Sequence, residues 1–292
     1  MATVLFAGFG DLGREAGRLL AGAGLHVVAL RRTPDAGAPG VTAHAVDLRE
    51  PFRLPPLPEL PAAVVIAVSP GRHDPDDYQA TYVGAVQHTL RALQASGAKP
   101  KLVLFVSSTG VWSESADLWI SEDTPARPDS WTGETMLRAE QALFAGPYPA
   151  VALRLGGIYG PGRYMLVRKA EAILAGHEPV PAPAYTNRIH RDDAARMIAF
   201  LVNRALAGAA LDKVYNGVDN EPSLNVDVLA YIGDLLQGRA PGETDITAKA
   251  PPPNVAVGGK RVGNARIRAL GFQFGYSDFR SGYAAVVKDY RR

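Results

Sequence analysis

Short apolar runs alternate with amphipathic segments of helical length through the first half of the chain. The apolar runs are continuous, which is typical of strands buried on both faces of a parallel sheet. They lie at residues 3–7, 26–30, 63–68, 101–107 and 150–155. Helical patterns lie between them at residues 11–21, 76–95 and 132–144, and Gly97 stands where a helix stop is expected. The alternation predicts an α/β fold with a doubly wound parallel sheet.

The regular alternation fades after about residue 155. Glycine and proline cluster at residues 156–162 and 179–183, followed by helical patterns at 192–206 and 225–236 around a short apolar run at 214–216. The sequence therefore predicts two domains, residues 1–155 with the sheet and residues 156–292 as a smaller C-terminal lobe. We expect the segment 190–216 to pack back on the first sheet, because a boundary in space need not follow the boundary in sequence.

The composition excludes several classes of protein. The 292 residues are 47% hydrophobic and 21% charged, which is too apolar for a disordered chain. The formal net charge is +2 with both signs interspersed, so a nucleic-acid partner is not expected. No apolar run approaches the roughly 20 residues that cross a bilayer, and no signal peptide is visible, so no membrane partner is expected either. The lack of cysteine excludes disulfides and thiolate chemistry and fits a cytoplasmic location.

A glycine-rich turn follows the first predicted strand directly. Its sequence is Gly8-Phe9-Gly10-Asp11-Leu12-Gly13, a GxGxxG pattern that opens the first predicted helix. In this context the glycines allow a tight turn and the close approach of a pyrophosphate to the helix N-terminus. A turn that only joined a strand to a helix would need one glycine, so we interpret the segment as a dinucleotide-binding loop.

The end of the second predicted strand carries Arg31 and Arg32, where a fold that prefers NAD usually carries Asp or Glu for the ribose 2′-hydroxyl. Guanidinium groups bind phosphate in a bidentate way, so the pair favours the 2′-phosphate of NADP, with NAD as the alternative cofactor. For Arg32 a solvated position at the strand end is an equal alternative. Asp47 either accepts a hydrogen bond from the adenine amino group or caps a turn. Val68, where a predicted strand ends, completes the expected cofactor-binding set.

Four further segments carry a resemblance to a known family: residues 106–112 (VSSTGVW), 153–162 (LRLGGIYGPG), 188–193 (RIHRDD) and 260–264 (KRVGN). With the glycine-rich turn, they make the chain resemble the extended short-chain dehydrogenase/reductase superfamily of nucleotide-sugar epimerases, dehydratases and their atypical relatives. The resemblance implies a Rossmann-type cofactor domain, a substrate lobe, and hydride transfer with a nicotinamide while a tyrosine acts as acid or base. It also implies a small-molecule substrate, usually a nucleotide sugar, and a homodimer.

The active-site pattern of this family matches the chain only in part. Ser108 stands in the place of the family's catalytic serine or threonine. The resemblance puts Thr132 and Met136 in the places of the Tyr-x-x-x-Lys pair, and no tyrosine of the chain has a lysine four residues later. The lysine charge helps to lower the pKa of the tyrosine, and moving a phenol from about 10 to about 7 requires roughly 4 kcal/mol. Thr132 cannot replace that pair.

Two functions remain open. One is an NADP-dependent reductase, epimerase or dehydratase of the atypical branch whose acid or base has moved to another position. Its candidates are Tyr82 and Tyr159, which the resemblance puts around the nicotinamide and substrate, although packing is the usual role of such aromatic residues. Arg163 and Arg188 are expected to bind the substrate. The other function is a non-catalytic NADP(H)-binding module that senses the cofactor or binds a partner protein.

Two hydrolase classes find little support in the sequence. A metal-dependent hydrolase would need ligands such as His190, Asp192 and Asp193, but their spacing does not put a pair on one helix face. We therefore expect no metal. A Ser-His-Asp hydrolase built on Ser108 and His190 would need a GxSxG strand-turn-helix elbow, which the sequence lacks.

Overall fold

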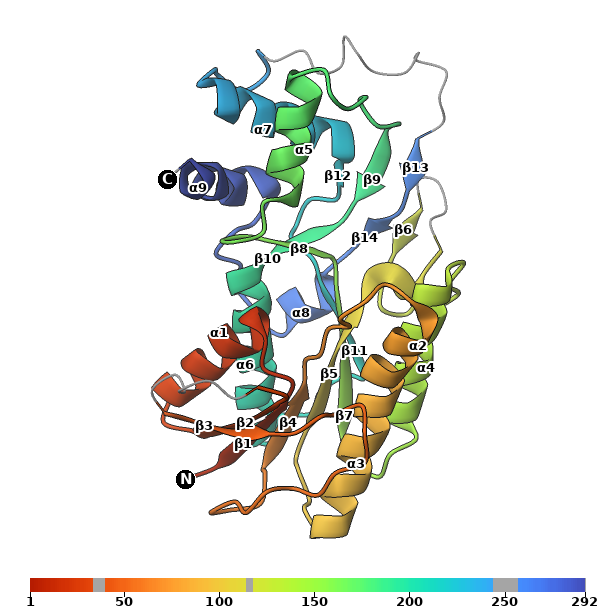
Figure 1. Cartoon of the computed structure of the whole chain (residues 1–292), viewed down its shortest axis with the longest axis vertical. Helices are drawn as coiled ribbons and strands as arrows, with labels where there is room; N and C mark the ends of the chain where they lie inside the picture. Colours follow the sequence, from red (N-terminus) through yellow and green to blue (C-terminus); the bar gives the residue numbers. More distant parts are fainter. Residues whose placement is uncertain (34–39, 114–117, 244–256, 292) are drawn as a thin grey trace. The chain divides into compact units, whose positions relative to one another are not determined.

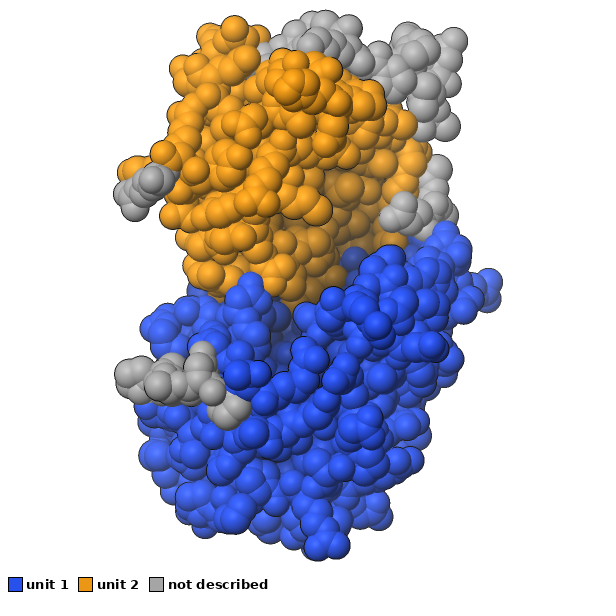
Figure 2. Space-filling model, viewed as in Figure 1, with its two compact units in different colours: residues 1–113, 125–154, 194–215 blue, residues 114–124, 155–193, 216–292 orange. Residues whose placement is uncertain are grey.

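The computed structural model describes residues 1–33, 40–113, 118–243 and 257–291. The chain divides into two units, which Figure 2 colours blue and orange. Unit 1 contains residues 1–113, 125–154 and 194–215, and unit 2 contains residues 114–124, 155–193 and 216–292. Each unit therefore takes its residues from three separate stretches of sequence. Within the described ranges, every helix is too short or too polar to span a bilayer.

Unit 1 is built on a seven-stranded sheet with the order β11-β7-β5-β4-β1-β2-β3. The pairings of β1 with β2 and β4, of β2 with β3, and of β4 with β5 are parallel. All residues of β1 and β4 are buried, as expected for strands covered on both faces. The prediction of a doubly wound α/β fold is confirmed. The strands are β1 (Thr3–Ala7), β2 (His26–Arg31), β3 (Val41–Ala45), β4 (Ala63–Ile66), β5 (Val103–Ser108), β7 (Ala150–Leu155) and β11 (Val214–Gly217).

Helices cover both faces of this sheet. Figure 1 shows α1 (Asp11–Gly22) and α6 (Arg191–Leu206) on one face, and α3 (Ala85–Ser96) and α4 (Trp131–Phe144) on the other. The pattern at residues 76–95 predicted one helix. The structure instead has α2 (Pro75–Tyr78), the π-helical segment η1 (Gln79–Gly84) and then α3, which run on without a break. Gly97 ends this run at φ +73°, the left-handed conformation that glycine adopts at helix ends.

Unit 2 is a small mixed unit whose core is formed largely by three helices, α5 (Met165–Leu174), α7 (Asn225–Gln237) and α9 (Phe279–Tyr290). The sequence pattern predicted α7 within one residue, and it missed α5 and α9. Short strand pairs complete the unit: β8 with β10, β9 with β12 and β13, and β6 with β14. The remaining elements are β6 (Trp119–Ile120), β8 (Gly157–Tyr159), β9 (Ala184–Thr186), β10 (Arg188–His190), β12 (Ser223–Leu224), β13 (Gly258–Gly259), β14 (Arg261–Val262) and α8 (Ala265–Ala269).

Candidate functional site

A cavity of about 270 Å³ lies in unit 1, where the parallel strands end. Its walls come from the segments that follow β1, β2, β3 and β4. β1 and β4 are neighbours, and the strand order reverses between them, with β2 and β3 on one side and β5 on the other. Ligands of open α/β sheets bind in the crevice at such a reversal point. The lining residues are Gly8, Phe9, Gly10, Arg31, Arg32, Thr33, Val46, Asp47, Leu48, Arg49, Ala67, Val68, Ser69, Gly71, Asp77 and Thr81.

Different structural constraints favour glycine at the three glycine positions of the turn after β1 and the start of α1. Gly8 has φ +92°, and a Cβ on it would lie 2.3 Å from the carbonyl oxygen of Ala67. A Cβ on Gly13 would lie 3.3 Å from the carbonyl oxygen of Gly8. Gly10 has φ −77°, which any residue adopts, and a Cβ on it would meet nothing within 4 Å. The chain's own atoms therefore explain Gly8 and Gly13, whereas Gly10 fits a ligand that approaches the backbone closely.

The first turn of α1 offers backbone donors next to Gly10. The carbonyl of Gly10 accepts the first helical hydrogen bond from the amide of Arg14, so the amides before it have no helical acceptor. The amide of Leu12 donates to Oδ1 of Asp11 at 2.8 Å. Helix N-termini carry partial positive charge and bind phosphate groups. The turn and this helix start therefore fit the pyrophosphate of a dinucleotide.

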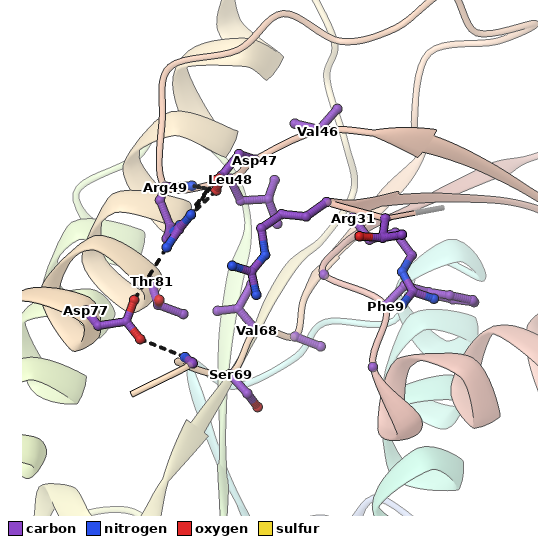
Figure 3. Close-up of a pocket in the computed structure, with 16 residues that line it drawn as sticks. Phe9, Arg31, Val46, Asp47, Leu48, Arg49, Val68, Ser69, Asp77 and Thr81 are labelled. Carbon is purple, nitrogen blue, oxygen red and sulfur yellow. Dashed lines mark hydrogen bonds and ion pairs between the residues drawn. The ribbon is translucent and has the colours of Figure 1, made fainter. Parts of the chain in front are cut away.

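The structure brings most of the predicted cofactor-binding residues to this one cavity. Gly8, Phe9 and Gly10 line it from the turn after β1, whereas Asp11, Leu12 and Gly13 form the first turn of α1. Arg31, Arg32, Asp47 and Val68 line it from the ends of β2, β3 and β4. Figure 3 shows Arg31, Asp47 and Val68 on different walls of the cavity.

Sequence analysis missed a charged network on the wall beside Asp47. Nε and Nη2 of Arg49 donate to the Asp47 carboxylate at 3.0 and 2.6 Å, and Nη1 lies 3.6 Å from Oδ1 of Asp77 (Figure 3). Oδ2 of Asp77 accepts hydrogen bonds from the amides of Gly71 and Arg72 at 2.6 and 2.7 Å. The bond from Arg49 holds the pKa of Asp47 below its ordinary value. For Asp77, the amide bond from Arg72 is the largest cause of a lowered pKa.

Ser108 and the two residues that the resemblance puts in the places of the Tyr-x-x-x-Lys pair also lie in unit 1. Ser108 ends β5, and its hydroxyl accepts a hydrogen bond from the amide of Gly110 in the short helix η2 (Thr109–Val111) at 3.0 Å. Thr132 lies in the first turn of α4, with its hydroxyl 3.2 Å from that of Ser130. Met136 is buried one turn further along. A Cβ on Gly133 would lie 2.2 Å from the carbonyl oxygen of Gly110, so α4 begins in direct contact with the turn after Ser108.

Tyr82 lies in η1 and is half-buried between aromatic neighbours. Its ring centroid is 5.4 Å from that of Tyr78 and 6.3 Å from that of Phe105. Burial raises the pKa of Tyr82 to about 12, so its phenol stays protonated at neutral pH and can act only as a proton donor there. Residues of η1 follow a π-helical path, which often marks a functional position in a helix.

The other three candidates lie in unit 2. Tyr159 is buried in the core of that unit, stacked on Tyr283 with ring centroids 4.5 Å apart. Burial is the main cause that raises its pKa. Arg188 is 4% exposed, with its guanidinium carbon 5.6 Å from the ring centroid of Phe279. Arg163 lies in a turn in which its amide donates to the carbonyl of Gly160 at 3.0 Å. In this structure Tyr159 and Arg188 therefore pack as core residues of unit 2.

A doubly wound sheet with a glycine-rich turn at its reversal point is the architecture of the dinucleotide-binding α/β proteins. Comparison with known families is more specific. The model of the NAD dependent epimerase/dehydratase family matches residues 5–216, and the chain belongs to this family. The resemblance noted in the sequence is thereby confirmed.

Individual relatives agree with this assignment. A Methylobacillus flagellatus protein described as a candidate NAD-dependent epimerase/dehydratase is 34% identical, with a TM-score of 0.79 over 100% of this chain and 99% of that one. Protein YeeZ of Escherichia coli (strain K12) is 27% identical over 221 residues, which are 71% of this chain and 76% of YeeZ. The UDP-glucose 4-epimerase of Thermus thermophilus, solved in complex with NAD, is 21% identical with a TM-score of 0.73, over 100% of this chain and 99% of that one. The last of these shows that the fold is shared.

Proposed function

We propose that the chain binds NADP(H) in the unit 1 cavity, in preference to NAD(H). The observation that carries this proposal is that Arg31 and Arg32 line the cavity at the end of β2, where none of the described lining residues carries a carboxylate. A guanidinium group attracts the 2′-phosphate of NADP, whereas a carboxylate at this position binds the 2′-hydroxyl of NAD and repels a phosphate. The amides at the start of α1 would hold the pyrophosphate. Asp47 would accept from the adenine amino group, and Val68 would contact the cofactor beside Gly8.

We further propose that the protein is an enzyme of the reductase, epimerase or dehydratase type. When bound, the nicotinamide supplies a hydride acceptor or donor. Within unit 1, Ser108 and Tyr82 would hold or donate a proton, and Tyr159 is the candidate within unit 2. Arg163 and Arg188 would bind the substrate. Because Tyr159 and Arg188 are buried in the core of unit 2, their proposed roles require unit 2 to rearrange. We infer a nucleotide sugar as the substrate, since a relative with this fold is a UDP-glucose 4-epimerase. We also infer a homodimer from the family resemblance, and a cytoplasmic location from the lack of cysteine.

A second function is supported by the residues in the places of the tyrosine and lysine. Thr132 has no acidic proton near neutral pH, and Met136 is apolar and buried. A chain that kept the cofactor cavity and lost the proton-transfer pair would be a non-catalytic NADP(H)-binding module. Such a module would distinguish NADP from NADPH, or bind a partner protein, without turning over any carbonyl compound or sugar.

Thermal unfolding with NADPH, NADP, NADH and NAD at equal concentration tests the proposed cofactor. A ligand at about 100 times its dissociation constant adds roughly 2.7 kcal/mol, which raises the Tm of a chain of this size by about 5 °C. We expect NADPH or NADP to give the larger rise, and Arg31→Asp to abolish the difference from NADH and NAD. Arg91→Asp, at an exposed position of α3, is the control and should leave all four responses unchanged.

The outcomes separate the two functions as well. A response to none of the four dinucleotides contradicts both the enzyme and the binding module. A response to NADPH with no turnover of UDP-glucose, other nucleotide sugars or simple carbonyl compounds supports the module. Turnover that is lost in Tyr82→Phe or Ser108→Ala supports the enzyme.

The variant Gly10→Ala tests the pyrophosphate site separately from folding. The added methyl group meets no atom of the chain, so we expect the unliganded protein to lose at most about 1 kcal/mol, the usual effect of alanine at a helix N-cap. NADPH affinity should fall at least about tenfold, because the methyl group occupies the space that a close phosphate needs. Gly22→Ala, at the other end of α1 and equally unobstructed, is the matched control and should bind NADPH normally. Normal NADPH binding by Gly10→Ala would contradict the proposed pyrophosphate position.

A further inference from the structure

We propose that Arg49 is a positioning residue that sets the preference for NADP indirectly, by neutralising Asp47 and Asp77 on the wall of the cavity. The inference rests on the proposed function, because it concerns the same cavity and the same cofactor. Unlike Arg31 and Arg32, Arg49 is not expected to contact the 2′-phosphate, yet it contributes to the preference for NADP.

The guanidinium of Arg49 is directed at the two carboxylates. Its Nε and Nη2 donate to Asp47, and its Nη1 faces Oδ1 of Asp77 at 3.6 Å. Its backbone amide also donates to Oδ1 of Asp47 at 3.1 Å. Arg49 is therefore held at both edges by the protein, and its fixed geometry suits a bridge between two carboxylates better than a contact with a ligand.

The charges on the cavity wall depend on this bridge. Among the described residues that line the cavity, five carry a charge: Arg31, Arg32, Asp47, Arg49 and Asp77. Three positive and two negative charges leave a net charge of +1. Without Arg49 the net charge is zero, and both carboxylates face the cavity without their shared cation.

The affinities for NADPH and NADH are expected to depend differently on the net charge of the cavity. NADPH and NADH share the pyrophosphate, whereas NADPH alone carries the additional negative charge of the 2′-phosphate. Uncompensated carboxylates in the same cavity repel that phosphate over distances comparable with the Debye length, about 10 Å at 0.1 M salt. Loss of Arg49 is therefore expected to weaken NADPH binding more than NADH binding.

Arg49 also connects two walls of the cavity. Asp77, its second partner, accepts hydrogen bonds from the amides of Gly71 and Arg72, in the segment that follows β4. Asp77 is itself 6% exposed and lies in α2, where the side chain of Asp74 accepts from its amide at 2.9 Å. A purely structural role of Arg49 in holding this segment would affect both cofactors equally, so the ratio of the two affinities distinguishes charge from structure.

The test is a fluorescence titration of the full chain with NADPH and with NADH. We expect Arg49→Met to weaken NADPH binding roughly tenfold and NADH binding at most about threefold at 0.1 M salt. Arg49→Lys should keep the wild-type ratio, because it retains the charge. The double variant Arg49→Met/Asp47→Asn should recover the ratio, because it removes one negative charge together with the positive one. At 1 M salt, where the Debye length is about 3 Å, the difference between wild type and Arg49→Met should shrink.

Controls and contrary outcomes follow from the same titration. Arg53→Met removes an exposed arginine that does not line the cavity, and it should change neither affinity. Equal losses for NADPH and NADH in Arg49→Met, with no recovery in the double variant, would show a structural role and overturn the inference. If the wild type prefers NADPH and Arg49→Met keeps the same ratio of NADPH to NADH affinity, the inference is overturned while the proposed function stands. If the wild type binds neither cofactor, the proposed function fails and the inference fails with it.

Discussion

Replacing Glu140 with glutamine is expected to lower the free energy of unfolding of unit 1 by about 3–5 kcal/mol. Glu140 is 1% exposed, and its carboxylate accepts three hydrogen bonds. Nε and Nη2 of Arg154 donate to it at 2.9 and 2.6 Å, and Oγ of Ser107 donates at 2.6 Å. Glutamine would leave the buried guanidinium of Arg154 without its counter-charge. Arg154 cannot lose its proton, so the uncompensated charge remains in the core.

Urea unfolding of three variants measures this effect. Arg154→Met should be destabilising in the same range as Glu140→Gln, because it leaves a buried carboxylate unpaired. The double variant Glu140→Leu/Arg154→Met should recover most of the loss, since an apolar pair of similar volume needs no desolvation of charge. Glu134→Gln, at an exposed position of the same helix, is the control and should change the free energy by less than about 0.5 kcal/mol. A loss below about 1 kcal/mol in Glu140→Gln would contradict the buried ion pair.

This ion pair supports the candidate site as well as the fold. Glu140 joins α4 to β5 through Ser107 and to β7 through Arg154, and Ser107 directly precedes Ser108. Arg154 also lies over the ring of Trp112, with its guanidinium carbon 4.5 Å from the centroid. With the contact of Gly133 against Gly110, these interactions fix the first turn of α4 beside the turn that follows Ser108. The helix on which the resemblance puts Thr132 in the place of a tyrosine is thus connected to β5, β7 and the turn after Ser108.

The parts of the fold that could be predicted are those in which burial leaves a local pattern. The runs at 3–7 and 150–155 match β1 and β7 residue for residue, because strands covered on both faces are mostly apolar, here with Thr3 and Arg154 as the exceptions. The edge strand β3 has no fully buried residue, so its pattern is weak. The π-helical path of η1 could not be predicted, because nothing in the sequence of residues 79–84 marks it. In unit 2, α5 follows the Gly- and Pro-rich segment 156–162, and α9 follows the irregular segment 270–278 with two glycines, so neither helix was visible in the regular alternation.

The candidate site divides in the same way. The glycine-rich turn and Arg31 could be predicted because their roles depend on elements adjacent in sequence. The turn lies between β1 and α1, and Arg31 ends β2. Arg49 could not, because its partner Asp77 comes from a different element and only the fold brings the two together. The spacing of Asp47 and Arg49, two residues apart in the turn that follows β3, was a local signal, since the side chain of Asp at the start of such a turn accepts from the amide two residues on. For Tyr159, the sequence could not show that the side chain is buried against Tyr283.

The second large effect concerns Asp219 in unit 2, whose replacement by asparagine is expected to stabilise the protein at high pH. Asp219 is 2% exposed, and its Oδ1 accepts from the amide of Glu221 at 3.1 Å. Its Oδ2 has no hydrogen-bond partner among the described residues. Burial raises its pKa from the ordinary 3.8 to about 7, and the nearby guanidinium of Arg188 offsets only part of that rise.

The sign of the effect follows from the two pKa values. Because the folded chain holds the proton more tightly than the unfolded chain, the stabilisation is complete below about pH 4 and is lost as the pH rises through about 7. A difference of about three between the two pKa values corresponds to about 4 kcal/mol, which is a large part of the usual stability of a domain. Asparagine cannot ionise, so Asp219→Asn should match the wild type near pH 4 and exceed its free energy of unfolding by about 4 kcal/mol at pH 8.

Urea unfolding of both proteins between pH 4 and pH 8, followed by circular dichroism, measures the difference directly. The comparison cancels other titrating groups, including His190, whose pKa is lowered by burial and whose effect on stability has the opposite sign. Asp227→Asn, at an exposed position of α7, is the control and should follow the wild-type pH profile. If Asp219→Asn is instead less stable than the wild type at pH 8, the ionised carboxylate of Asp219 stabilises the folded protein there as the counter-charge of Arg188. In that case Arg188 is held in the core by a charge pair and is a poor candidate for binding substrate.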